Sequence, residues 1–124
     1  MNMRESISAA RIAAVERATD GVAMVQFRFG AKDPVFAGHF PGRPLLPGVF
    51  QLEMARSTAE WVLETPLAVH EICRAKFLRP IVPEELVHLE VKLSEQNGEI
   101  RVRAAFSAGG QAAGEAVLLL KRCE

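Results

Sequence analysis

Hydrophobic and polar residues alternate along most of the second half of the chain. Over 87–94 the odd positions are Val, Leu, Val and Leu, and the even ones are His, Glu, Lys and Ser. A period of two predicts a half-buried β-strand. The same alternation returns over 100–106, after Asn97-Gly98, a dipeptide typical of two-residue hairpins. With a third strand over 112–121, after Gly109-Gly110, these segments predict an antiparallel meander.

Three further segments add to the predicted sheet: one indicates where a strand lies in it, and two predict additional strands. The run Ala116–Leu120 is continuously apolar, which indicates burial on both faces and hence a central position. A strand is expected over Ile72–Leu78, closed by two prolines that cannot donate to a sheet ladder. Another is expected over Val22–Phe29, with alternate apolar residues on one side.

The N-terminal stretch Ser6–Ala18 is compatible with two structures. Its alanines favour a helix. However, Asp20-Gly21 would close a hairpin if Ile7–Glu16 were a strand. We interpret this stretch as a strand.

One long helix is expected from Pro47 to Glu64. Proline suits the first helical position, where its missing N–H would be unpaired in any case. Apolar residues cover most of the circumference of this helix, which is expected when a sheet wraps around it. The predicted order is therefore two strands, one long helix and four strands.

Composition narrows the class of protein. The 124 residues suffice for one domain, residues 1–124. With 49% apolar and 24% charged residues, the chain resembles an ordinary globular protein. Fifteen basic and fifteen acidic residues cancel, so we expect no nucleic-acid partner. The longest apolar run has five residues, so we expect no membrane span, which needs about 20.

The remaining features predict a cytoplasmic location and no metal. The first residues lack the apolar core of a secretory signal. Cys73 and Cys123 follow no pairing pattern, so free thiols are expected. The histidines lie too far apart in the sequence for a metal-ligand pattern; they are His39, His70 and His88. We expect His70 and His88 to have structural roles only.

A stiff loop precedes the long helix. Four of the seven prolines and three glycines lie within DPVFAGHFPGRPLLPGVFQLE. Prolines fix φ and glycines allow conformations closed to other residues, so this loop has a specific shape. It contains His39, and such loops often carry reacting groups.

These residues resemble a known family. The segment Gly38–Val49, GHFPGRPLLPGV, with Glu53 fourteen positions after His39, resembles the beta-hydroxyacyl-[acyl-carrier-protein] dehydratases (FabZ/FabA-like). The segment Ala75–Pro83, AKFLRPIVP, is similar to a second motif of that family. The resemblance covers about Val22 to Leu120 and implies an α+β hot-dog fold, a curved antiparallel sheet wrapped around one long central helix.

The resemblance also implies an activity. Such a hydro-lyase removes water from a beta-hydroxyacyl thioester and gives the trans-2-enoyl thioester, in fatty-acid or polyketide-like biosynthesis. By resemblance His39 is the base, which suits a pKa near neutrality. Glu53 is the acid, a role that needs a raised pKa. The N–H groups of Gly48 and Val49, at the positive end of the helix dipole, hold the thioester carbonyl.

Further site residues and partners follow from the same resemblance. No cofactor or metal is required, because the substrate arrives on the phosphopantetheine of acyl carrier protein or coenzyme A. The protein is expected to be a homodimer with shared active sites, either alone or as a trimer of dimers. The loop and substrate tunnel would use Phe40, Pro41, Gly42 and Phe50. A basic rim for the carrier protein would use Arg43, Arg74, Lys76 and Arg79.

Two alternatives remain open, a hot-dog thioesterase and a non-catalytic acyl-binding partner subunit. Glu53 shares a helical stripe with Arg56 and Glu60, so it could form an i, i+3 ion pair that keeps it ionised. The family usually has a small residue in place of Arg56 and a glutamine in place of Ser57. An ion pair with Arg56 would favour the partner-subunit alternative.

Overall fold

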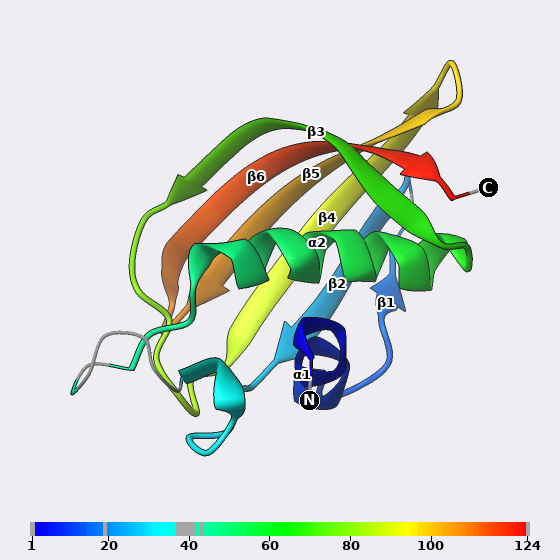
Figure 1. Ribbon diagram of the computed structural model, residues 1–124. Helices are drawn as coiled ribbons and strands as arrows, with labels where there is room; N and C mark the ends of the chain where they lie inside the picture. Colours follow the sequence, from blue (N-terminus) through cyan, green and yellow to red (C-terminus); the bar gives the residue numbers. More distant parts are fainter. Residues whose placement is uncertain (1, 19, 37–41, 43, 124) are drawn as a thin grey trace.

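A computed structural model describes residues 2–18, 20–36, 42 and 44–123 of the chain. A six-stranded antiparallel sheet curves around one long helix, as Figure 1 shows. The strand order is β1-β2-β4-β5-β6-β3. The elements are α1 (Met3–Ala10), β1 (Glu16–Arg17), β2 (Val22–Phe27), the 3-10 helix η1 (Pro34–Phe36), α2 (Gly48–Leu63), β3 (Leu67–Phe77), β4 (Val87–Gln96), β5 (Glu99–Ala108) and β6 (Gln111–Arg122).

The long helix is confirmed as α2, with a small difference at its start. Pro47 has extended dihedrals (φ −61°, ψ 144°), so it is the N-cap and the first helical residue is Gly48. At the other end Glu64 adopts the left-handed conformation, and its N–H donates to the Glu60 carbonyl at 2.7 Å. Met54, Ala55 and Ala59 are fully buried. The two alanines on this face let the sheet approach the helix closely.

The meander of β4, β5 and β6 is also confirmed. Asn97-Gly98 and Gly109-Gly110 form the two turns with positive φ at all four residues. Inward side chains of β4 and β5 are buried and alternate with exposed ones. β6 lies between β5 and β3, away from the sheet edges, as expected. Burial on both of its faces was too strong an expectation, because Val117 and Leu119 are only half-buried on the side away from α2.

The interpretation of Ile7–Glu16 as a strand is wrong. Residues 3–10 form α1, whose first turn is capped by Asn2, since its Oδ1 accepts from the Glu5 N–H at 2.9 Å. Ile7 is fully buried against the core, so tertiary packing reinforces the helical propensity of the alanines. The Asp20-Gly21 turn does form, but it joins β2 to a strand of only two residues.

β3 forms one edge of the sheet. It is 11 residues long and starts at Leu67, earlier than the predicted strand over Ile72–Leu78. Every residue of β3 after Leu67 is exposed, and β3 pairs only with β6 among the described strands. Its free edge therefore presents a long row of backbone groups for pairing.

An ion pair fixes the connection from β3 to β4. Arg79 Nη2 donates to Glu85 Oε2 at 2.7 Å, and Arg79 Nη1 donates to the Ala108 carbonyl at 3.2 Å. The other Glu85 oxygen accepts from the Val82 N–H at 3.2 Å. The hydrogen bond from Arg79 lowers the pKa of Glu85 below its usual value. Arg79, held by Glu85, thus links the connection to the end of β5.

Replacing Gly21 with alanine should destabilise the fold more than the same change at Gly98. Both glycines have positive φ, but a Cβ at Gly21 would lie 2.5 Å from the Leu93 carbonyl oxygen, whereas Gly98 has open space. We expect Gly21→Ala to lower the free energy of unfolding by about 2–3 kcal/mol and Gly98→Ala by about 1 kcal/mol. Urea unfolding measures both, and equal losses would contradict the close contact.

Replacing Glu85 with glutamine should lower the free energy of unfolding only at pH values at which Glu85 is ionised. A carboxyl with a lowered folded-state pKa stabilises the fold above its unfolded pKa, and this contribution is lost as pH falls through the folded value. The loss at pH 7 should be about 0.5–1 kcal/mol, because the pair is partly solvated. Urea unfolding of both proteins should show this gap at pH 7 and its closure below about pH 4. A gap that persists at low pH would show that the charge is not responsible.

Candidate active site

The start of α2 borders a cavity of about 440 Å³. The ring of Phe77, at the end of β3, lies so close to Gly48 that a Cβ there would be 2.6 Å from a ring carbon. The first N–H groups of a helix have no intrahelical partner and lie at the positive end of its dipole. The cavity can therefore receive a carbonyl oxygen. Its walls are Leu45, Leu46, Pro47, Gly48, Gln51, Phe77, Leu78, Arg79 and Pro80.

The structure places the predicted carbonyl-binding residues at this helix start. Gly48 lines the cavity, and Val49 beside it is 55% exposed. The Phe50 N–H is already taken by the Pro47 carbonyl at 3.0 Å. The Phe50 ring packs edge-on against Phe29, with ring centroids 6.2 Å apart. This side chain therefore contacts the core beside the cavity.

Part of the predicted site lies outside the described residues, namely His39, Phe40, Pro41 and Arg43. Gly42 is described, and its φ of +79° is a conformation that glycine adopts readily. The role of His39 as base stays a prediction.

Glu53 lies in the predicted ion pair with Arg56. Arg56 Nε lies 2.9 Å from both Glu53 oxygens, and Arg56 Nη2 also donates to Oε1. Arg4 of α1 adds a weaker contact, with its Nε 3.6 Å from Glu53 Oε1. Both carboxyl oxygens of Glu53 therefore accept hydrogen bonds from a guanidinium that stays charged.

Arg56 is the centre of a larger buried cluster. Its side chain is 4% exposed, and its Nη1 lies 2.7 Å from Glu60 Oε2 and 3.0 Å from the Leu67 carbonyl oxygen. The same Glu60 oxygen accepts from the Leu67 N–H at 2.8 Å. Hydrogen bonding to Glu53 is the main reason that the pKa of Arg56 is raised. The cluster thus joins the middle of α2 to the first residue of β3.

The predicted basic rim is only partly available. Arg74 on β3 pairs with Glu115 of β6 at 2.7 Å, and Arg79 is held by Glu85. Lys76 is exposed on β3, one residue before Phe77.

The sequence reasoning missed Gln51, which projects from α2 into the space beneath the sheet. Gln51 is 3% exposed, and its Oε1 has no hydrogen-bond partner among the described residues. Two signals in the sequence could have found it. A polar residue interrupts an apolar helix face, and Gly114 interrupts a strand, which often marks a close approach.

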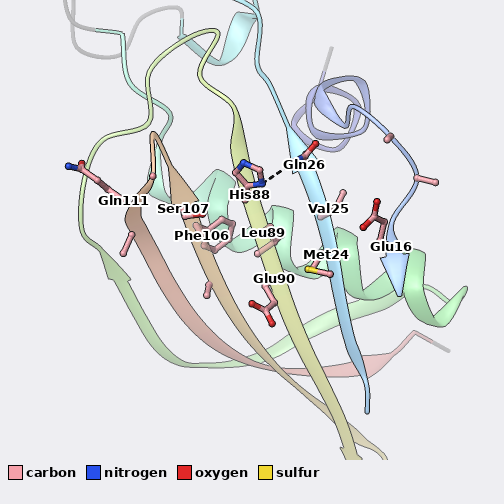
Figure 2. A pocket seen from close by; sticks show the side chains of 15 residues that line it. Glu16, Met24, Val25, Gln26, His88, Leu89, Glu90, Phe106, Ser107 and Gln111 are labelled. Carbon is pink, nitrogen blue, oxygen red and sulfur yellow. Dashed lines mark hydrogen bonds between the residues drawn. The ribbon is translucent and has the colours of Figure 1, made fainter. Parts of the chain in front are cut away.

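A larger hollow of about 550 Å³ lies on the opposite face of the sheet, away from α2 (Figure 2). It contains His88, whose Nδ1 lies 3.1 Å from Gln26 Nε2 in a hydrogen bond. His88 therefore lies on the polar face of β4, as expected for a histidine with a structural role. The N-terminus of α2 is on the other side of the sheet, so we place the candidate site there.

Other predicted features can be compared with the described part of the chain. Both cysteines there are free thiols, as expected. No cluster of three or more potential metal ligands occurs among the described residues. Within the same ranges, no helix has the length and apolar character needed to cross a membrane.

Comparison with known proteins gives a consistent assignment. The chain is 37% identical over 97 residues to 3-hydroxyacyl-[acyl-carrier-protein] dehydratase FabZ of Pelotomaculum thermopropionicum, covering 72% of this chain and 69% of the relative. Among solved structures, the dehydratase heterocomplex ApeI:P from Xenorhabdus doucetiae matches with a TM-score of 0.77 and 28% identity, over 90% of this chain and 96% of the other.

A hypothetical thioesterase from Streptococcus pneumoniae, solved with coenzyme A, matches with a TM-score of 0.71 over 98% of this chain and 94% of the other. Its identity is 10%, so it shares the fold alone. These similarities and the sheet around α2 confirm the expected hot-dog fold. Residues 15–115 match the family described as ApeI-like, ApeI dehydratase. The chain belongs to the ApeI-like dehydratase family.

Proposed function

We propose that this protein removes water from a beta-hydroxyacyl thioester and gives the trans-2-enoyl thioester. The single observation that carries the proposal is the cavity at the N-terminus of α2, in a chain whose relatives are 3-hydroxyacyl-[acyl-carrier-protein] dehydratases. The substrate is carried on the phosphopantetheine of acyl carrier protein or coenzyme A. The protein acts in the cytoplasm and needs no cofactor, metal, membrane or nucleic acid.

The reaction needs a base, a proton donor and a group that stabilises negative charge. His39 takes the proton from the carbon next to the thioester carbonyl. The electron pair forms the new double bond, and the bond from the β-carbon to oxygen breaks. The N–H groups at Gly48 and Val49 stabilise the enolate-like oxygen. The departing hydroxide takes up one proton and leaves as water.

Glu53 is the second reacting group, and the proposal assigns it to the departing hydroxyl. As a carboxylate, with both oxygens accepting from Arg56, it can also accept a hydrogen bond from that hydroxyl. Glu53 can act as the acid once it has taken up a proton. If Glu53 stays ionised, His39 transfers the proton that it removed from carbon to the departing hydroxide, which leaves as water.

A homodimer completes the site in this proposal, alone or as a trimer of dimers. The exposed edge of β3 can pair with a second copy. Large apolar side chains are exposed along and near this edge, which suits a covered surface. They are Val49, Val69, Ile72, Phe77 and Leu78. Glu53 of one subunit would then meet His39 of the other, with the acyl chain between them.

One observation favours a second function. Arg56 occupies the position where the family usually has a small residue, and it holds Glu53 in a buried ion pair. A chain with this arrangement could bind acyl groups without turnover and complete the site of another hot-dog subunit.

A turnover assay separates the two functions. We expect purified protein to convert a short beta-hydroxyacyl thioester to the enoyl product, measured by its absorbance while free thiol is followed in parallel. His39→Ala should lower the rate by about 100-fold or more, because it removes the base. His88→Ala is the matched control, since His88 is exposed on β4, on the face of the sheet away from α2.

The other outcomes of this assay have different meanings. Free thiol without enoyl product would indicate a thioesterase. Absence of both signals, with carrier-protein and coenzyme A substrates of several lengths, would overturn the dehydratase proposal and support the partner-subunit function.

Replacing Arg56 with methionine should destabilise the protein. The change leaves the half-buried Glu53 and Glu60 without their shared counter-ion. We expect the free energy of unfolding at pH 7 to fall by about 2–4 kcal/mol. Arg101→Met, on the exposed side of β5, is the control and should stay within about 0.5 kcal/mol. A similar small effect for Arg56→Met would contradict a structural role for the cluster.

A further inference from the structure

Gln51 carries a buried acceptor that the described part of the fold leaves unsatisfied. Its side chain is almost fully buried, and no described donor reaches its Oε1. Buried polar groups in native proteins nearly always have partners, because an unpaired acceptor costs free energy. Gln51 follows Gly48, the first residue of α2, by three positions. Residues at this spacing are neighbours on one side of a helix, so the Gln51 side chain lies one turn beyond Gly48.

The sheet is shaped to accommodate this amide. A Cβ at Gly114 of β6 would lie 2.3 Å from Gln51 Oε1 and 3.2 Å from the Lys76 carbonyl oxygen. Any other residue at this position would displace the amide. A glycine inside a strand weakens the strand, so its presence is explained by the close approach of Gln51.

The cavity around Gln51 suits the apolar part of a ligand. Leu45, Leu46, Phe77 and Leu78 line it together with Gln51. The nearby Arg79 guanidinium donates to Glu85 and to the Ala108 carbonyl. Because Gln51 lines this cavity, a donor on a ligand bound there would satisfy the orphaned acceptor.

We propose that Gln51 Oε1 accepts a hydrogen bond from an N–H or O–H group of the acyl-pantetheine thioester bound in this cavity. The identity of the ligand rests on the proposed function. Such a thioester offers two kinds of donor, the β-hydroxyl of the acyl group and the amide N–H groups of the pantetheine arm. Dehydration removes the hydroxyl, so an acceptor for that group would bind the substrate more tightly than the enoyl product.

Two substitutions test the proposal by different routes. Gln51→Met keeps the length of the side chain but removes the acceptor. Gly114→Ala keeps Gln51 but forces its amide to move. Gln96→Met, at the exposed end of β4, is the matched control. Each is made in the His39→Ala background, so that hydroxyacyl substrate survives while its dissociation constant is measured.

The ligands are beta-hydroxyacyl, saturated acyl and trans-2-enoyl coenzyme A thioesters of one chain length. We expect Gln51→Met to weaken binding about three- to tenfold, the effect of one lost hydrogen bond. Gly114→Ala should give the same ligand pattern, and Gln96→Met should give no change. A loss confined to the hydroxyacyl ligand identifies the hydroxyl as the donor, and equal losses for all three identify the pantetheine amide.

Thermal unfolding separates a ligand-binding amide from a structural one. We expect the Tm of Gln51→Met to stay level or rise, because an unpaired buried acceptor is removed. Unchanged affinities of Gln51→Met, with or without a lower Tm, would overturn the proposal. Failure of the parent protein to bind any of the three thioesters would overturn it as well. Wild-type turnover is measured separately, so binding without turnover would refute the proposed function and leave the role of Gln51 intact.

Discussion

Burial of α2 beneath the curved sheet is the constraint on which the other features depend. Met54, Ala55 and Ala59 are inaccessible to solvent, and the two alanines let the sheet pack close to the helix axis. Because α2 is held in this way, its N-terminus is fixed against the end of β3. The contact between Gly48 and the Phe77 ring follows from that placement. The cavity is therefore a product of how the helix and the edge strand meet.

The polar groups on α2 are hard to explain by folding alone. Arg56 brings a charge into the interior and needs two carboxylates and a backbone carbonyl to accommodate it. A buried ion pair of this kind often adds little stability compared with apolar residues, although removal of one member is costly. Gln51 has no such compensation within the described structure. Departures from apolar packing tend to occur at functional sites, and both of these lie on the helix that begins at the cavity.

The ion pair of Glu53 also links structure to chemistry. A general acid must carry a proton, while a partner of a guanidinium favours the carboxylate. The protein thus places a guanidinium, which donates to both carboxyl oxygens, beside Glu53 in a motif that resembles that of the dehydratases.

The sequence determined the sheet meander, the long helix, their order and the fold family. These features rest on local periodicity, turn residues such as Asn97-Gly98, and an ordered motif, all of which are visible along the chain. Local preference left Ser6–Ala18 ambiguous between helix and strand, and in α1 the burial of Ile7 against distant residues accompanies the helix. The Glu53–Arg56 pair was predictable, since its partners are one helical turn apart.

Only the tertiary structure revealed that Arg56 also binds the Leu67 carbonyl, that Arg79 is held by Glu85, and that Gln51 lies against Gly114. The contacts of Arg56 and Gln51 join residues from different elements, and the Arg79–Glu85 pair forms within an irregular connection, so no spacing along the chain encodes them. They depend on how the sheet curves around α2, which is set by the packing of the whole core.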